Sequence, residues 1–202
     1  MQSRRDFLKA GGTVLAGFAL SPRGVFSRVA VEVIEMRSYV AGSHVWFDPI
    51  GLYIDPGTTV RWIVRENVHT VTAYHPRNDH HSLRIPEHAV PWDSGFLVHP
   101  GDHFDVTLTV PGVYDYFCAP HEAAGMVGRI VVGKPVQPAA QPFDYWVGKP
   151  GTRGWRRVPD AARKNFVSVA RINAERRVHP SIGVSLRSQI DRHSSWSIFV
   201  ED

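Results

Sequence analysis

Residues 112–128 read Gly-Val-Tyr-Asp-Tyr-Phe-Cys-Ala-Pro-His-Glu-Ala-Ala-Gly-Met-Val-Gly, and this stretch decides the fold class predicted for the chain. Within it Cys118, His121 and Met126 follow a C-x2-H-x4-M spacing between two apolar runs. A thiolate, an imidazole and a thioether are the soft and borderline ligands that favour copper. One loop between two strands that delivers three such ligands leaves a fourth to come from elsewhere in the chain.

The fourth ligand is expected to be one of the eleven histidines. His69 is the first candidate because it follows the apolar run Val60–Val64, and a regular strand gives a rigid backbone that can aim a side chain. His75, just before Pro76, is the competitor. Two histidines and one cysteine with a weak axial methionine make up the blue-copper ligand set.

An alternation of apolar and polar residues extends outward from this loop over residues 29–133. A period of two is typical of strands with one buried face. Turn signals at 55–57, 100–101 and 111–112 separate the runs, and residues 74–94 are expected to form a long loop with room for a short helix. The segment is therefore predicted to be an all-β sandwich. The apolar members of three runs are Val29, Val31 and Val33; Val60, Trp62 and Val64; and Phe104, Val106, Leu108 and Val110.

Residues 44–133 resemble the plastocyanin/pseudoazurin-type blue copper proteins, the cupredoxins. The stretch 112–128 is the most specific part of the resemblance, and the Asp55-Pro56-Gly57 turn, His69 and Ser94-Gly95-Phe96 support it. Two positions depart from the usual pattern: Thr70 stands where many relatives carry Asn, and Phe117 where plant-type members often carry Tyr.

The resemblance implies a Greek-key β-sandwich, cupredoxin-like, with one type 1 copper ion under one end. It implies that such a protein carries single electrons between redox partner proteins, which would dock near His121, the electron port. The copper ligands that it implies are His69, Cys118, His121 and Met126.

The single cysteine and the histidines also have plainer interpretations. A lone cysteine is more often a small buried apolar residue, but a free thiol in an oxidising compartment is a liability unless it is buried or metal-bound. A second metal site within residues 75–103 is an alternative to solvated loop histidines, which we favour. The histidines in question are His75, His80, His81, His88, His99 and His103.

The sequence favours an electron carrier over an enzyme. No nucleophile elbow, H-E-x-x-H motif or phosphate-binding glycine loop occurs, and copper oxidases need further copper sites that one sandwich cannot supply. The alternative function is a periplasmic copper-binding or copper-delivery protein, and a third is a sensor or scaffold that works through its basic tail. The net charge of +4 is too small to indicate nucleic acid as a partner, and a monomer is expected.

The first 28 residues are predicted to be an export signal. Ser3-Arg4-Arg5-Asp6-Phe7-Leu8-Lys9 precedes a short apolar run, residues 10–20, which is too short to span a bilayer. A twin arginine before such a run is the bacterial Tat signal. The protein is therefore expected in the periplasm, and at the membrane only if the signal is not cleaved.

Charge divides the remaining chain into a copper domain, residues 29–133, and a C-terminal extension, residues 134–202. Residues 29–133 carry six Lys or Arg and twelve Asp or Glu, whereas residues 134–202 carry twelve Lys or Arg and six Asp or Glu. The extension is expected to start with a Pro-rich linker, to contain a helix over residues 160–178 and to end in a β-hairpin or without order. The aromatic residues at 143–155 are expected either to form an interaction surface or to cover the sandwich, and we predict that the extension packs on the acidic domain through them.

Overall fold

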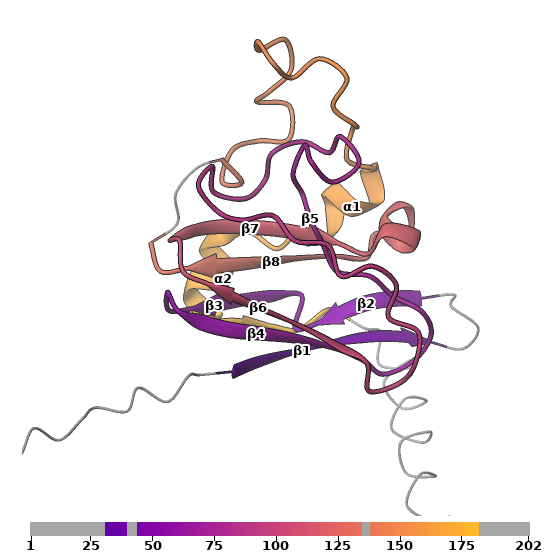
Figure 1. Ribbon diagram of the computed structural model, residues 1–202. Coiled ribbons are helices and arrows are strands. Elements are labelled where there is room, and N and C mark those ends of the chain that lie inside the picture. Colours follow the sequence, from indigo (N-terminus) through magenta and orange to yellow (C-terminus); the bar gives the residue numbers. More distant parts are fainter. Residues whose placement is uncertain (1–30, 40–43, 135–137, 182–202) are drawn as a thin grey trace, which may run out of the picture.

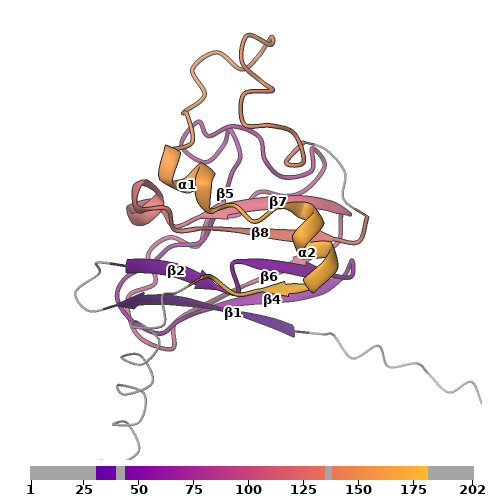
Figure 2. The ribbon, with the colours of Figure 1, turned by 180° about the vertical axis from the view of Figure 1, so that it is seen from behind.

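The computed structural model describes residues 31–39, 44–134 and 138–181. Two sheets pack face to face, and two short helices lie against the outer side of the second sheet (Figures 1 and 2). The first sheet has the strand order β2-β1-β4-β6 and the second β5-β7-β8-β3-β9. The predicted all-β sandwich with a partly helical extension is confirmed.

The strands of the first sheet are β1 (Val31–Tyr39), β2 (His44–Asp48), β4 (Thr58–Val64) and β6 (His103–Leu108). Those of the second are β3 (Gly51–Ile54), β5 (Thr72–Ala73), β7 (Gly112–Phe117), β8 (Val127–Val132) and β9 (Arg177–Val178). The helices are a 3₁₀ segment, η2 (Ala119–Ala124), and two α-helices, α1 (Asp160–Asn165) and α2 (Val169–Glu175). Residues 74–94 form a long loop, and no helix occurs within it.

The core between the sheets follows the predicted alternation in β4 but not in β1. Trp62 in β4 is fully buried, as expected. In β1, however, Val31 and Val33 are 49% and 40% exposed, and Ile34 is one of the residues that enter the core. The parallel pairing of β1 with β4 is the reason, because its register sets Ile34 beside Trp62 and so gives both side chains the same face.

Strands β7 and β8 are buried along their whole length, which a two-layer sandwich alone does not produce. The C-terminal extension covers their outer face as a third layer (Figure 2). Ile172 of α2 packs there with Val113 and Val131, and its position explains Gly51, where a Cβ would lie 2.9 Å from the Ile172 side chain. Packing of the extension on the copper domain is therefore observed.

The helix expected over residues 160–178 is confirmed in part, because two short helices and a strand occupy this range instead of one continuous helix. Phe166 and Ser168 have extended backbones, and the Ser168 hydroxyl caps α2 by accepting a hydrogen bond from the Arg171 amide. Between them the carbonyl of Val167 accepts a hydrogen bond from the buried Arg129. This hydrogen bond from β8 occupies a carbonyl that would otherwise accept a helical hydrogen bond, so a tertiary contact overrides the helical pattern.

The aromatic residues expected to hold the extension in place divide into two groups. Phe143 packs toward the body, in a cluster with Phe117 and Val127. Tyr145, Trp146 and Trp155 instead belong to a loop, residues 143–158, that projects from the body at the top of Figure 1. The prediction is therefore confirmed for Phe143 and wrong for the other three, and aliphatic residues of α1, α2 and β9 supply further docking contacts.

Within the described part of the chain, no helix is long and apolar enough to cross a membrane. The predicted export signal and the final run, residues 182–202, lie outside the described residues.

Candidate metal centre

Three predicted ligand residues meet at one end of the sandwich, each positioned by a different piece of backbone. His69 follows β4 and is fixed by two backbone hydrogen bonds with Leu97, of 3.0 and 2.9 Å. Cys118 comes directly after the last residue of β7, and His121 lies in η2, the short helix that follows. The chain thus brings residues 49 positions apart into one buried cluster.

The donor atoms of these residues face one another. Cys118 Sγ lies 3.3 Å from His121 Nδ1 and 3.7 Å from His69 Nδ1. All three donor atoms lie within 4.8 Å of one another. His69 and Cys118 are fully buried, whereas His121 is partly exposed. The cluster is therefore closed toward the core and open to solvent only on the His121 side.

Met126 lies at the end of the same loop and is fully buried. The Cys118 amide donates to the Met126 carbonyl at 3.1 Å, and the Met126 amide donates to the His121 carbonyl at 3.1 Å. Gly125 makes this return possible, because its φ of 90° is left-handed and costs little only for glycine. The loop is thus folded back on itself, and it holds the methionine beside the other three residues.

Thr70 joins the two segments that carry the cluster. Its hydroxyl accepts a hydrogen bond of 2.7 Å from the Ala119 amide, and its own amide donates to Cys118 Sγ at 3.3 Å. Thr70 occupies the position where many cupredoxins carry Asn. The hydroxyl oxygen can accept the same kind of bond as an amide oxygen, so the departure from the family pattern leaves the link in place.

Burial sets the protonation of the cluster without a metal. It lowers the pKa of His69 to about 4, with the neighbouring His121 acting in the same direction, and it also lowers the pKa of His121. Burial raises the pKa of the Cys118 thiol to about 11, although the Thr70 amide opposes this shift. At neutral pH the cluster therefore offers two neutral imidazoles and a thiol, whose proton a cation must displace.

This donor set fits a copper ion. Neutral imidazole nitrogens are ready ligands, and a buried thiol between them becomes a strong thiolate ligand when a cation replaces its proton. Among the described residues, this is the one group of three or more His, Cys, Asp or Glu side chains with converging donor atoms. His75 is not part of it, since its Nδ1 accepts a hydrogen bond from the Arg77 amide.

A second set of buried polar residues supports the loop from the other side. The Tyr74 hydroxyl donates to Glu122 Oε1 at 2.6 Å, and His81 Nε2 lies 3.6 Å from Glu122 Oε2. His81 packs on the Phe117 ring, with centroids 4.4 Å apart. Burial lowers the pKa of His81 to about 4, so this contact with Glu122 is not an ion pair at neutral pH.

Sequence reasoning missed Glu122 and Tyr74. The sequence shows only an acidic residue directly after His121 and a tyrosine at the start of the predicted long loop, and neither indicates a contact. It also missed Asn165, whose side-chain amide donates to the Gly125 carbonyl at 2.9 Å from α1. These contacts come from the long loop and the extension, for which the pattern gave no register.

Known proteins resemble this chain over the residues that form the sandwich and the cluster. Residues 34–133 match the family model of copper-binding proteins of the plastocyanin/azurin family. Plastocyanin from Oryza sativa subsp. indica is 41% identical over 139 residues, which cover 64% of this chain and 80% of that protein. Plastocyanin from Hordeum vulgare is 57% identical over 37 residues, only 24% of that protein. A Sinorhizobium pseudoazurin structure is 26% identical, covers 72% of this chain and 95% of that one, and has a TM-score of 0.49.

The chain therefore belongs to the plastocyanin/azurin family of copper-binding proteins. Its cofactor is one type 1 copper ion, and the chain is a cupredoxin with an additional C-terminal extension beyond the matched residues.

Proposed function

We propose that this protein is an exported mononuclear type 1 copper protein that carries single electrons between redox partners, without enzymatic activity of its own. The observation that carries the proposal is the convergence of two imidazole nitrogens and one thiol sulfur at a buried end of the sandwich. The ligands that we propose are His69, Cys118, His121 and Met126.

A type 1 copper ion supplies one-electron chemistry when it is bound, because it alternates between Cu(II) and Cu(I). The residues of this chain would hold its ligands in one arrangement in both states. The hydrogen bonds of Thr70 to Ala119 and to Cys118 Sγ, together with the His69–Leu97 pairing, restrict how far the donors can move. Little rearrangement then accompanies electron gain or loss, and this favours rapid transfer.

The surface around His121 suits brief docking of a partner. Ala119, Pro120 and Ala123 are exposed beside it. Phe96, next to the residue that pairs with His69, is 68% exposed. An apolar surface with a partly exposed ligand at its centre lets a partner approach without removing water from charged groups. We therefore place the docking site for redox partners here.

A copper-delivery protein is the second candidate function, and burial argues against it. Cys118, His69 and Met126 are fully buried, so a bound metal could leave only after the ligand loop opens. The hydrogen bond that the Thr70 hydroxyl accepts from Ala119 and the one that Asn165 donates to Gly125 hold that loop closed. Such restraint slows the release of a metal, which a delivery protein needs, and it limits the movement of the ligands, which favours an electron carrier.

Three variants test the copper assignment. The copper-loaded protein should show the intense visible thiolate-to-copper absorption, a reversible one-electron midpoint potential and rapid self-exchange. Cys118→Ser and His69→Ala should each abolish the absorption, and His75→Ala, the matched control outside the cluster, should keep it. A colourless copper complex of the native protein would contradict the proposal, and loss of colour in the His75 variant alone would overturn the ligand assignment.

Export is tested separately, because the predicted signal is independent of the copper ligands. Changing Arg4 and Arg5 together to Lys should keep the protein in the cytoplasm of an expressing bacterium, whereas Lys9→Arg should leave export intact. Cell fractionation with visible absorption of the periplasmic fraction measures the outcome. Equal amounts of periplasmic protein from all three forms would refute Tat export.

A further inference from the structure

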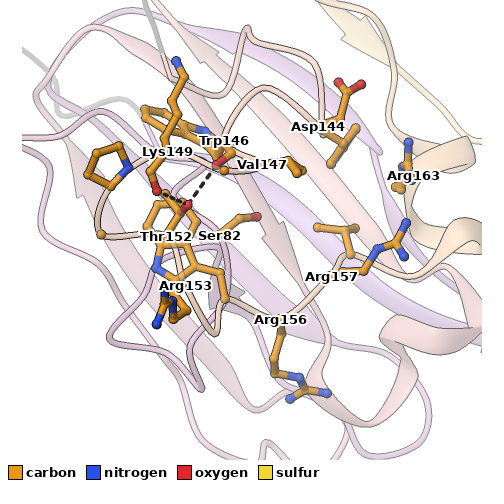
Figure 3. Close-up of a pocket in the computed structure, with 16 residues that line it drawn as sticks. Ser82, Asp144, Trp146, Val147, Lys149, Thr152, Arg153, Arg156, Arg157 and Arg163 are labelled. Carbon is orange, nitrogen blue, oxygen red and sulfur yellow. Dashed lines mark hydrogen bonds between the residues drawn. The ribbon is translucent and has the colours of Figure 1, made fainter.

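The C-terminal extension forms a pocket remote in sequence from the copper ligands. Its volume is about 960 Å³, at the upper end of the range of small-molecule sites. All of its lining residues except Ser82 belong to the segment 143–163 (Figure 3). Apart from Ser82, the pocket is therefore formed by the extension and lies outside the residues matched to the family.

The loop that builds the pocket has a defined structure although it contains no helix or strand. Consecutive turns run through it, and the Thr152 hydroxyl donates to the carbonyls of Trp146 and Lys149 at 2.8 and 2.7 Å (Figure 3). At its base the Arg156 amide donates to the His80 carbonyl at 2.8 Å. Loops of more than about 12–15 residues without secondary structure are uncommon in compact domains and are usually functional or linkers. A loop closed by its own hydrogen bonds is not a linker.

Positive charge dominates the lining. Five cations line the pocket against the single acid Asp144. Arg156 is paired with Asp79 and Arg163 with Asp160, both of which are outside the lining. The remaining cations are Lys149, Arg153 and Arg157.

Two of these cations are available to a ligand. Arg153 and Arg157 have no acidic partner among the residues that the structure describes, whereas Lys149 lies 3.1 Å from the centre of the Tyr145 ring. A guanidinium group can bind a carboxylate or phosphate with two parallel hydrogen bonds. The pocket therefore selects an anion.

Aromatic rings are the second feature of the pocket that selects its ligand. Phe143, Trp146 and Trp155 line the same pocket, and the Trp146 and Trp155 rings lie 5.9 Å apart at an angle of 62°. Such rings offer flat apolar surfaces to a planar ligand. A free phosphate ion would use only the arginines, and an apolar ring only the tryptophans. A ligand that carries both groups uses both features.

We propose that the pocket of the extension binds a small anionic aromatic molecule, with a ring against Trp146 and Trp155 and a carboxylate or phosphate on Arg153 or Arg157, which lie on different sides of the lining (Figure 3). The site is independent of the copper ligands. An acidic protein segment is a less suitable occupant, because the aromatic surfaces lie inside a concave site and an extended chain would not reach them.

Calorimetric titration of the full-length copper-loaded protein tests this proposal. The probes are 1-naphthyl phosphate and 1-naphthoate, which distinguish phosphate from carboxylate, with 1-naphthol and inorganic phosphate as controls that each lack one feature. At least one anionic naphthyl probe should bind, and each control should bind at least about tenfold more weakly, because hydrogen bonds to charged groups contribute about that factor or more. An acidic peptide serves as a further probe.

Variants locate the binding. Arg153→Gln or Arg157→Gln, whichever removes the arginine that binds the anion, should weaken binding of the anionic probe about tenfold. Trp155→Leu should also weaken binding of the anionic probe, and 1-naphthol should still bind this variant more weakly than the anionic probe does. Arg171→Gln is the matched control, since this exposed arginine lies on α2, pairs with Glu175 and does not line the pocket. Visible absorption of the copper site confirms that each variant is folded.

Four results would overturn the proposal. They are failure of both anionic probes to bind below 1 mM, equal binding of 1-naphthol, unchanged affinity in both pocket arginine variants, and preferential binding of the acidic peptide.

Discussion

The two faces of strand β7 are both buried, but by different means. Toward the first sheet, Tyr114, Tyr116 and Cys118 enter an apolar core. Toward the extension, Asp115 accepts hydrogen bonds of 2.7 Å from both Arg84 and Arg129, and no part of its side chain is exposed. Neighbouring residues of one strand thus serve a metal-binding core on one side and a buried ionic cluster on the other.

The ionic cluster is completed by the extension. Arg84 donates to the carbonyls of Ala139 and Gln141, and Arg129 donates to that of Val167. The Arg84 guanidinium also lies 3.9 Å from the centre of the Phe143 ring. Removing charges from water is costly unless their hydrogen bonds are satisfied, so this face depends on the extension.

The copper end shows the opposite principle. Its donors converge on one another and have few other partners, and the contacts with Thr70 position them without occupying all their lone pairs. Satisfied polar groups therefore hold the outer face together, whereas incompletely satisfied ones at the copper end are available for a cation. Variants that change one of these regions and leave the other intact test whether the two can be separated.

Deletion of residues 135–202 should have the largest effect. It would leave Arg84 and Arg129 without their carbonyl acceptors and would expose the apolar outer face of β7 and β8. Each large aliphatic side chain buried there contributes about 1.5–3 kcal/mol, so the free energy of unfolding should fall by about 5 kcal/mol or more. Calorimetry and binding of an apolar dye measure the result, with deletion of residues 182–202 as the control that keeps all these contacts.

Raised salt should change this stabilisation little. The exposed pairs between extension and body, such as Arg177 with Glu32, contribute only about 0–1 kcal/mol each, whereas burial of apolar surface does not depend on screening. If the shortened protein melts at the same temperature and binds no extra dye, the extension is an independent arm, and the contrast between the two faces loses its energetic meaning.

Asp115→Asn should have the next largest effect. It keeps the shape of the side chain but leaves two buried arginines without their counter-charge, so the free energy of unfolding should fall by about 3–5 kcal/mol. Urea unfolding measures the change. Because the Asp115 side chain points away from the core, the blue absorption of the folded fraction should be retained, and a spectrum as altered as that of a ligand variant would contradict the separation of the faces.

A triple change of Arg84, Asp115 and Arg129 to Met, Leu and Met supplies the control. Removing all the charges together avoids an unpaired ion, so it should destabilise the protein less than Asp115→Asn alone. A triple variant less stable than the single one would show that the carbonyl acceptors of the extension, rather than Asp115, dominate the cluster.

The copper end was predictable from sequence because its chemistry is local. Cys118, His121 and Met126 lie within nine residues, and His69 follows a strand with clear alternation. The outer face was not, because its partners lie far apart in the chain: Arg84 and Asp115 are 31 residues apart. Asp115 also stands between Tyr114 and Tyr116, where a polar residue is typical of a strand with one solvated face. A sequence pattern predicts which face of a sheet a side chain lies on only when one face is solvated, and β7 and β8 are buried on both faces.

His81 lies where the two regions meet, and it predicts a pH dependence of stability. Its pKa of about 4 in the folded protein is below the ordinary 6.5, because burial disfavours the charged form. The unfolded chain therefore binds a proton as pH falls below 6.5 while the folded protein does not, and stability is lost between pH 6.5 and about 4. The full loss from this group is about 3 kcal/mol.

His81→Phe removes the imidazole that binds the proton and keeps an aromatic side chain against Phe117. The difference in unfolding free energy between native and variant proteins should therefore shift in favour of the variant as pH is lowered from 7 to 4.5. Urea unfolding of both proteins in the same metal state measures it, and contributions of other histidines cancel in the difference. Parallel stability curves would show that His81 titrates normally.

Asn165→Ala should have the smallest effect on stability and is the sharpest test of coupling between the regions. Its hydrogen bond to the Gly125 carbonyl is a direct link from the extension to the ligand loop, and it contributes about 1 kcal/mol. Asn165 is exposed, so water can take the place of its amide at the Gly125 carbonyl in the variant. We therefore expect a loss of at most about 1 kcal/mol in the free energy of unfolding.

The copper potential gives the more informative measurement for this variant. If one oxidation state alone felt the whole hydrogen bond, the midpoint potential would shift by about 40 mV, since 59 mV corresponds to about 1.4 kcal/mol for one electron. A smaller shift is expected, because both states keep the same loop. Lys164→Ala, an exposed neighbour on the same helix, should leave the potential unchanged. A potential equal in all three proteins would mean that the extension stabilises the sandwich without adjusting its copper, and that the two faces of β7 act independently.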